Sequence, residues 1–280
     1  QFPQWADLPL TTINNTGTDN VIIRLGETMM VRLPRIAGAA GCIDKEHTWL
    51  PVLAQQLPLT VPVPLAKGNS GAGYPFAWSV YPWLTGETAT VENIVNHNKN
   101  AVLLAQFVRA LQHIPADGSL PPGSHNGHRG VPLANRDAQT RAVIATLGDR
   151  WDTQALIDIW EIALNAPVWD KAPVWLHGDI QAGNLLVQHG TISAVIDFGC
   201  LGMGDPACDL LVAWNLLNTE ARQIFRQTLN VDDATWARGK GWALSVGVIA
   251  YPYYVQSNPT LAEINRCAID AVLNAHHGGH

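Results

Sequence analysis

The stretch from Trp175 to Leu211 constrains the fold of this chain more than any other segment. Two short apolar runs, residues 185–187 and 192–196, are separated by the pair His189-Gly190. Apolar runs of strand length joined by a Gly-containing turn predict a β-hairpin. A hairpin brings the chain back to its starting point, so we expect the residues directly before and after it to lie side by side.

Three side chains that carry oxygen ligands flank this hairpin. Asp179 follows an apolar run, Asn184 comes five positions later, and Asp197 directly follows the second run of the hairpin. Mg²⁺ prefers oxygen ligands and takes its remaining coordination from water and substrate phosphates. Each residue alone is typical of an ordinary turn. The order Asp-x4-Asn and then Asp-Phe-Gly, however, matches the catalytic loop and the metal-binding Asp of kinases.

The local form of the motif is His-Gly-Asp179, and Asp205-Pro-x-x-Asp209-Leu follows the Asp-Phe-Gly sequence. With these motifs the chain resembles the aminoglycoside phosphotransferase and choline kinase superfamily over residues 15–275. The resemblance implies an α+β, bilobal, protein-kinase-like fold. The N-terminal lobe would hold a small antiparallel β-sheet and one helix, and the larger C-terminal lobe would be mainly helical. The implied cofactors are ATP or GTP, as phosphoryl donor, and Mg²⁺, held by Asn184 and Asp197.

We expect residues 1–84 to form the N-terminal nucleotide-binding lobe. Residues 85–280 would form the helical C-terminal lobe, with the catalytic loop and the acceptor site. An apolar strand that ends at Tyr-Pro82 marks the boundary, and the resemblance implies a hinge near residues 78–84. In the family this connector binds the purine edge through its backbone, and Pro82 has no N–H group to donate. The nucleotide contacts expected here are Val80, Tyr81 and Trp83.

A turn-rich loop, residues 14–20, precedes a second predicted hairpin with strands at residues 21–25 and 29–33. In a kinase-like lobe such a loop lies over the nucleotide phosphates and offers backbone N–H groups to them. The loop lacks the Gly-x-Gly-x-x-Gly spacing, so taken alone the pattern favours an ordinary hairpin. The phosphate-binding residues that the resemblance implies are Thr16, Gly17, Asp19 and Asn20.

Arg32 lies on the second strand of that hairpin, where kinases carry a phosphate-binding Lys. A helix predicted at residues 39–55, with a break at its proline, carries Glu46. An ion pair between Arg32 and Glu46 would orient the guanidinium onto the α- and β-phosphates, and its forked donors suit phosphate. The alternative is a pair of unrelated exposed side chains. We exclude Lys45 as the phosphate ligand because adjacent helix positions face different directions.

The resemblance also implies roles for residues around the catalytic loop. Asp179 would accept or orient the proton of the attacking hydroxyl group. Gln181 stands where relatives carry His and protein kinases Lys; it donates a hydrogen bond but brings no charge, which predicts a slow or acceptor-selective enzyme. His177 is expected to shape the loop from the interior, and Asp209 to hold the loop N–H groups. Asp205 is expected to cap the helix that follows it.

Apolar residues at helical spacing predict a long core helix at residues 91–114. The next segment, residues 115–136, is rich in proline and glycine, as is typical of functional or mobile loops. It is either a flap near the acceptor site or a structural surface loop. Further helices are predicted at residues 137–147, 152–164, 206–217, 232–254 and 259–274.

The chain has a net charge of −6, which argues against nucleic acid or an anionic membrane as a partner. No apolar run reaches the roughly 18 to 20 residues of a membrane span. Four Cys without a Cys-x-x-Cys pair predict reduced thiols. We therefore expect a cytoplasmic protein, a monomer or weak dimer, that binds a small hydroxylated acceptor molecule.

The predicted function is Mg²⁺-dependent transfer of the γ-phosphoryl group of ATP or GTP to a hydroxyl of a small molecule. Aminoglycosides, other antibiotics, amino alcohols and sugars all fit, because the fold does not fix the substrate. A nucleotide-binding pseudoenzyme is one alternative, against which the intact Asp179, Asn184 and Asp197 argue. A protein kinase is another, against which the absence of Ala-Pro-Glu and of a long segment after Gly199 argues.

Overall fold

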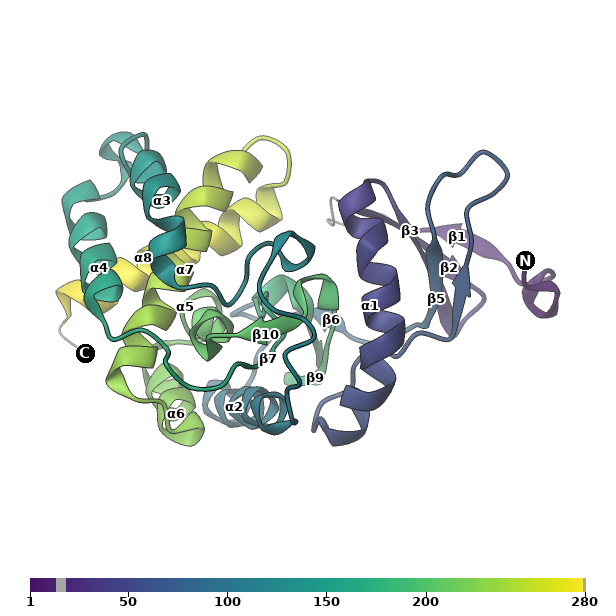
Figure 1. The fold of residues 1–280 in the computed structure, drawn as a ribbon, viewed down its shortest axis with the longest axis horizontal. Coiled ribbons are helices and arrows are strands. Elements are labelled where there is room, and N and C mark those ends of the chain that lie inside the picture. The colour runs from purple at the N-terminus through teal and green to yellow at the C-terminus, as the bar shows by residue number, and fades with distance from the viewer. Residues whose placement is uncertain (14–18, 279–280) are drawn as a thin grey trace.

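The computed structural model describes residues 1–13 and 19–278. Its N-terminal part is a five-stranded antiparallel sheet in the order β1-β2-β3-β5-β4, with one helix, α1 (Ala37–Leu53), against it (Figure 1). Strands β2 and β3 form the predicted hairpin, because an alternating pattern on each side of the Gly26 turn pairs residue by residue. The strands are β1 (Leu10–Thr12), β2 (Asn20–Leu25), β3 (Met29–Pro34), β4 (Ala66–Gly68) and β5 (Trp78–Pro82).

Strand alternation divides the side chains of this sheet between two faces. Val31 and Val80 pack with Leu25 in a small apolar core on one face. Arg32 and Tyr81, one position further along their strands, point to the other face, toward α1. Because side chains alternate between the two faces of a strand, Arg32 of β3 lies on the face that α1 covers.

Helix α1 continues through Pro51, so the predicted break at that position is wrong. Leu50 and Leu53, on either side of Pro51, are fully buried in the large core of the C-terminal part. Their burial outweighs the hydrogen bond that the proline removes from the helix. The segment after α1 stays close to that core as well, because Thr60 forms a bridge to Ala194 of strand β9 (Thr191–Val195).

The C-terminal part is mainly helical, and the helices surround the catalytic segment (Figure 1). The first of them begins at His97 rather than at residue 91, because Asn96 caps it by accepting from the Lys99 N–H. Helix α7 runs through Pro252, and α6 was not predicted. The helices are α2 (His97–His113), α3 (Asp137–Ile144), α4 (Thr153–Asn165), α5 (Val212–Asn215), α6 (Thr219–Leu229), α7 (Asp233–Tyr254) and α8 (Pro259–His277).

Two small sheets carry the catalytic segment. The predicted hairpin pairs β8 with β9 and turns at His189-Gly190, where both residues have positive φ. Strand β6 pairs with β8, and β7 pairs with β10. The bounds are β6 (Glu87–Thr88), β7 (Val174–Leu176), β8 (Leu185–Gln188) and β10 (Gly202–Gly204). Within residues 1–13 and 19–278, no helix combines the length and apolar character needed to cross a membrane.

Candidate active site

The catalytic loop begins at His177, where β7 ends, and Asp209 fixes its backbone. The buried Asp209 carboxylate accepts hydrogen bonds from the N–H groups of His177 (2.8 Å) and Gly178 (2.7 Å). Burial raises the pKa of Asp209, although His177 and these two N–H groups act in the opposite direction. Gly178 has a φ of 83°, and a Cβ atom there would lie 2.5 Å from the carbonyl oxygen of Cys200. The close approach explains why the motif needs glycine at this position.

The His177 ring is fully buried and joins the loop to the end of the hairpin. Its Nε2 lies 3.1 Å from the carbonyl oxygen of Ile196, and its Nδ1 accepts from the N–H of Asp179 at 3.2 Å. The ring also packs on Phe198, with centroids 4.5 Å apart. The ring thus bonds to the backbone through both of its nitrogens. His177 therefore lies where an interior residue that shapes the loop is expected.

Both oxygens of the Asp179 carboxylate are hydrogen-bonded. Oδ2 accepts from Nε2 of Gln181 (2.9 Å) and Nδ2 of Asn184 (3.0 Å). Oδ1 accepts from Nη2 of Arg129 at 3.1 Å. The side chain of Asp179 is 21% exposed. The carboxylate is thus held in one orientation and still open to a small molecule.

Asp197 lies beside the catalytic loop because the hairpin returns the chain there. The N–H of Ile196 donates to the carbonyl oxygen of Asn184 at 2.9 Å. Asp197 has a φ of 62°, and its side chain accepts from the N–H of Gly199 at 3.3 Å. A non-glycine residue with such a φ is uncommon, although Asp adopts it more readily than most residues. The structure thus joins the side chains of Asp179 and Asn184 directly and places the backbone before Asp197 against that of Asn184.

These ligands suit a hard cation that binds together with phosphate. Among residues 1–13 and 19–278, no group of three or more His, Cys, Asp or Glu side chains could hold a metal ion. Asn184 directs its Nδ2 toward Asp179, which leaves its side-chain oxygen as a possible metal ligand, and Asp197 supplies a carboxylate at the end of the hairpin. Mg²⁺ commonly binds through one or two carboxylates, with water and phosphate oxygens completing its shell. The residues present therefore fit Mg²⁺.

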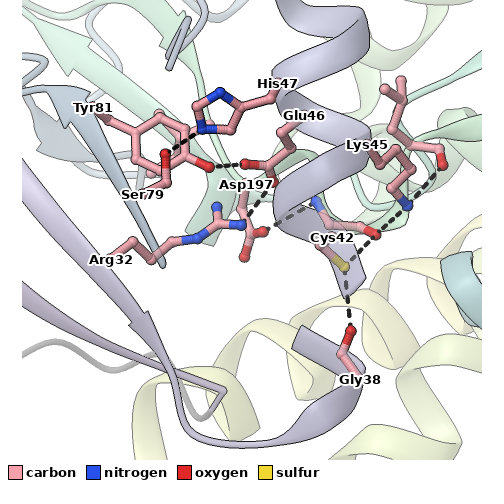
Figure 2. Close-up of polar contacts among 12 residues, drawn as sticks. Arg32, Gly38, Cys42, Lys45, Glu46, His47, Ser79, Tyr81 and Asp197 are labelled. Atoms are coloured by element: carbon pink, nitrogen blue, oxygen red, sulfur yellow. Dashed lines mark hydrogen bonds and ion pairs between the residues drawn. The ribbon is translucent and has the colours of Figure 1, made fainter. Parts of the chain in front are cut away.

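The predicted ion pair between Arg32 and Glu46 is present, with 2.9 Å between Nη2 and Oε1 (Figure 2). Both side chains are buried, and the Tyr81 hydroxyl donates to the second oxygen of Glu46. Burial lowers the pKa of Arg32, but Glu46, Tyr81 and Asp197 raise it above its ordinary value. The Arg32 Nε has no hydrogen-bond partner within the described part of the chain. A fixed cation with a spare donor beside Asp197 fits a nucleotide phosphate.

The loop expected over the phosphates is only partly described. Thr16 and Gly17 lie outside the described residues. Asp19 lies directly before β2, and its carbonyl oxygen accepts from the N–H of Arg35 at 2.7 Å. Asn20 pairs with Pro34 at the start of the hairpin.

The connector expected to bind the purine uses several of its backbone groups within the sheet. The Trp83 N–H donates to the carbonyl oxygen of Thr28 at 2.7 Å, and the Val80 carbonyl oxygen accepts from Leu65 at 2.8 Å. The side chain of Tyr81 is fully buried against Glu46. The Trp83 N–H is therefore not a free purine donor, contrary to our expectation, because it bonds to Thr28, in the turn between β2 and β3.

Asp205 caps the 3₁₀ turn that begins at Pro206, since its Oδ1 accepts from the N–H of Ala207 at 3.0 Å. The same carboxylate forms a bidentate ion pair with Arg238 of α7, at 2.7 and 3.1 Å. Both side chains are almost completely buried. Asp205 thus links the catalytic segment to α7, a partner that the sequence did not indicate.

Lys45 faces away from Arg32 on α1 and bonds to the loop after Asp197. Its ammonium donates to the carbonyl oxygens of Gly199 (2.7 Å), Leu201 (3.0 Å) and His125 (3.0 Å). Burial lowers the pKa of Lys45. The role of Lys45 in joining α1 to this loop was missed, because no sequence pattern marks a cation that binds backbone carbonyls.

A Lys45→Met variant is expected to lose about 2–4 kcal/mol of unfolding free energy, because three carbonyl oxygens lose a charged donor. Denaturant unfolding measures this difference. The matched control is Lys67→Met, which removes an exposed Lys that pairs with Asp44 and should cost no more than about 1 kcal/mol. Equal losses in the two variants would show that the Lys45 contacts do not stabilise the fold.

Comparison with known proteins places this fold and site in one family. A sequence model of the phosphotransferase enzyme family matches residues 11–242, and the chain belongs to that family. Its fold is that of the aminoglycoside phosphotransferases, which is protein-kinase-like, so the predicted fold class is confirmed.

Individual relatives are distant. The chain is 27% identical over 144 residues to an aminoglycoside 3'-phosphotransferase of Salmonella typhimurium, covering 50% of this chain and 53% of that protein. The chain thus spans about half the length of the curated relatives it matches. The solved GDP and kanamycin complex of APH(2'')-IIIa has a TM-score of 0.68 at 18% identity, covering 100% of this chain and 97% of the other. Macrolide 2'-phosphotransferase MphH from Brachybacterium faecium has a TM-score of 0.62 at 22% identity, and the match covers 98% of this chain and 95% of the other.

Proposed function

We propose that this protein transfers the γ-phosphoryl group of ATP or GTP to a hydroxyl group of a small molecule. The observation that supports the proposal best is the contact between Asp179 and Asn184, with the backbone before Asp197 bonded to Asn184. The buried pair of Arg32 and Glu46 adds a fixed cation beside Asp197. Such a site works by positioning and by electrostatic stabilisation, with little covalent work by the protein.

Each residue has a defined part in this reaction. Asp179 orients the acceptor hydroxyl and takes its proton, and Gln181 and Asn184 hold the Asp179 carboxylate. Asn184 and Asp197 would hold Mg²⁺, which neutralises charge on the phosphate oxygens when bound. Arg32 binds the phosphates of the donor nucleotide, assisted by the loop from Thr16 to Asn20, and the connector around Tyr81 binds the purine.

We infer that the acceptor is an antibiotic. The curated relatives are named aminoglycoside 3'-phosphotransferases, and solved proteins of the same fold include complexes with kanamycin and a macrolide 2'-phosphotransferase. We further propose that the protein works in the cytoplasm, where nucleoside triphosphates are available, as a monomer or weak dimer. Its partner is then a small molecule rather than nucleic acid or membrane, in keeping with the net charge of −6.

A nucleotide-consumption assay over a panel of acceptors tests this proposal. The panel contains aminoglycosides, macrolides, amino alcohols and sugars, each with ATP and with GTP. We expect turnover with at least one antibiotic, and loss of that turnover when EDTA removes divalent cations. Turnover with a metabolite but with no antibiotic would support phosphoryl transfer and contradict an antibiotic as the acceptor. No turnover with any acceptor would favour a nucleotide-binding pseudoenzyme.

A further inference from the structure

The loop before α3, residues 115–136, reaches the catalytic loop through Arg129. The Arg129 guanidinium donates to Oδ1 of Asp179 at 3.1 Å, on the side opposite to Gln181 and Asn184. Within the described part of the chain, Arg129 is the cation that forms an ion pair with Asp179. The pair is largely buried, because the side chain of Arg129 is 15% exposed and that of Asp179 is 21% exposed.

The backbone of Arg129 is held firmly in this place. Its N–H donates to the carbonyl oxygen of Asn126 at 3.2 Å, and the buried Asn126 amide donates back to the Arg129 carbonyl at 3.1 Å. The next residue, Gly130, accepts from the N–H of Asp205 at 3.0 Å. Gly130 has a φ of 84°, and a Cβ there would lie 2.5 Å from Leu176. The loop is therefore packed onto the catalytic segment and is not a free flap.

Arg129 places a positive charge next to Asp179, whereas the catalytic loop itself places none there. Gln181 contributes a neutral amide to Asp179, at a position where the resemblance to phosphotransferases leads one to expect a charged side chain. Burial lowers the pKa of Arg129, but the Asp179 carboxylate and Cys200 raise it above its ordinary value. The buried Arg129 Nε has no hydrogen-bond partner among the residues described. The site thus contains a fixed positive charge and one spare donor.

We propose that Arg129 is a positioning residue of phosphoryl transfer, which aims the Asp179 carboxylate and supplies the positive charge absent at Gln181. This inference rests on the proposed function. In the reaction the acceptor oxygen forms a bond to phosphorus, and the bond from phosphorus to the bridging oxygen breaks. The electron pair of that bond leaves with the nucleoside diphosphate. The acceptor proton passes to Asp179 and then to water. The role of Arg129 is to keep Oδ1 directed at that proton.

The role of Arg129 changes the expectation that the neutral Gln181 makes the enzyme slow. If Arg129 provides the charge, the neutral residue at position 181 does not make the enzyme slow. A Gln181→Lys variant should then not raise kcat, since a second cation adds little where one is already fixed and the amide that holds Asp179 is lost.

Four variants test the proposal by steady-state kinetics on the acceptor found for the wild-type protein. Arg129→Gln should lower kcat about 10²-fold, the usual cost of one preorganised donor, with KM for the nucleotide unchanged within about twofold. Arg129→Lys should lose less, and Gln181→Lys placed in the Arg129→Gln variant should regain at least about tenfold. The control is Arg136→Gln, which removes a neighbouring Arg over the same Trp242 ring without contact to Asp179; its kcat should stay near the wild-type value.

The outcomes separate the inference from the proposed function. A wild-type protein that is inactive on every acceptor overturns both. With an active wild type, Arg129→Gln within about twofold of the wild-type kcat overturns the inference alone, and so does a lack of recovery when Lys is added at position 181. If Arg129→Gln fails to fold, Gln181→Lys alone decides. A rise in its kcat of about tenfold or more would mean that the site lacked a charge, which contradicts the role of Arg129.

Discussion

An Asp179→Asn variant is expected to lose phosphoryl transfer by about 10³-fold, within the range that a positioned general base contributes. Asparagine has nearly the same shape as aspartate but cannot take the proton of the acceptor hydroxyl. Its amide also places a donor toward either Arg129 or Gln181, both of which donate to the present carboxylate. Turnover is measured with the acceptor found for the wild-type protein.

Nucleotide binding should survive in the same variant, because Arg32, Glu46 and Asp197 are unchanged. Calorimetric titration with a non-hydrolysable ATP or GTP analogue should give a Kd within about twofold of the wild-type value. Asp149→Asn, at an exposed carboxylate, serves as the control and should alter neither quantity. Full turnover in Asp179→Asn would exclude Asp179 as the base, whereas loss of nucleotide binding would mean that the substitution distorts the whole site.

An Asp209→Ala variant is expected to lose about 3–5 kcal/mol of unfolding free energy. The substitution leaves the N–H groups of His177 and Gly178 buried without an acceptor, and a bond to a charged group is worth about 1.5–3 kcal/mol. Both bonds are short, at 2.8 and 2.7 Å, and the carboxylate is fully buried. Denaturant unfolding measures the loss, and turnover should fall with it because the catalytic loop is no longer held.

Asp233→Ala provides the comparison for this experiment. Asp233 also pairs with a cation, Arg226, but its side chain is 99% exposed, so the substitution should cost less than about 1 kcal/mol. A stability of Asp209→Ala equal to that of Asp233→Ala would contradict the role of Asp209 in holding the loop.

The features that were predicted best from the sequence are those that depend on short-range periodicity. Alternation along β3 was enough to turn Arg32 toward α1, and a Gly-containing turn was enough to bring Asp197 back to Asn184. Helix ends were less predictable. Pro51 and Pro252 both lie inside helices, because tertiary packing can outweigh the local cost of proline.

The two cations that complete the site could not be predicted in the same way. Lys45 binds carbonyl oxygens, which every residue possesses, so no residue type marks its partners. Arg129 lies in a loop without periodicity, and only tertiary packing brings it 3.1 Å from Asp179. The one available signal was indirect: a neutral residue at position 181 left the catalytic loop without a positive charge next to Asp179.

The burial of the last turns of α1 in the large core has a consequence for domain motion. Trp49 packs edge-on against Trp175 of β7 with ring centroids 4.8 Å apart, and Thr60 is bridged to Ala194. The C-terminal end of α1 is therefore anchored in the C-terminal part, while Arg32 ties the middle of the same helix to the sheet. Any change in the angle between the sheet and the catalytic segment has to strain one of these two attachments.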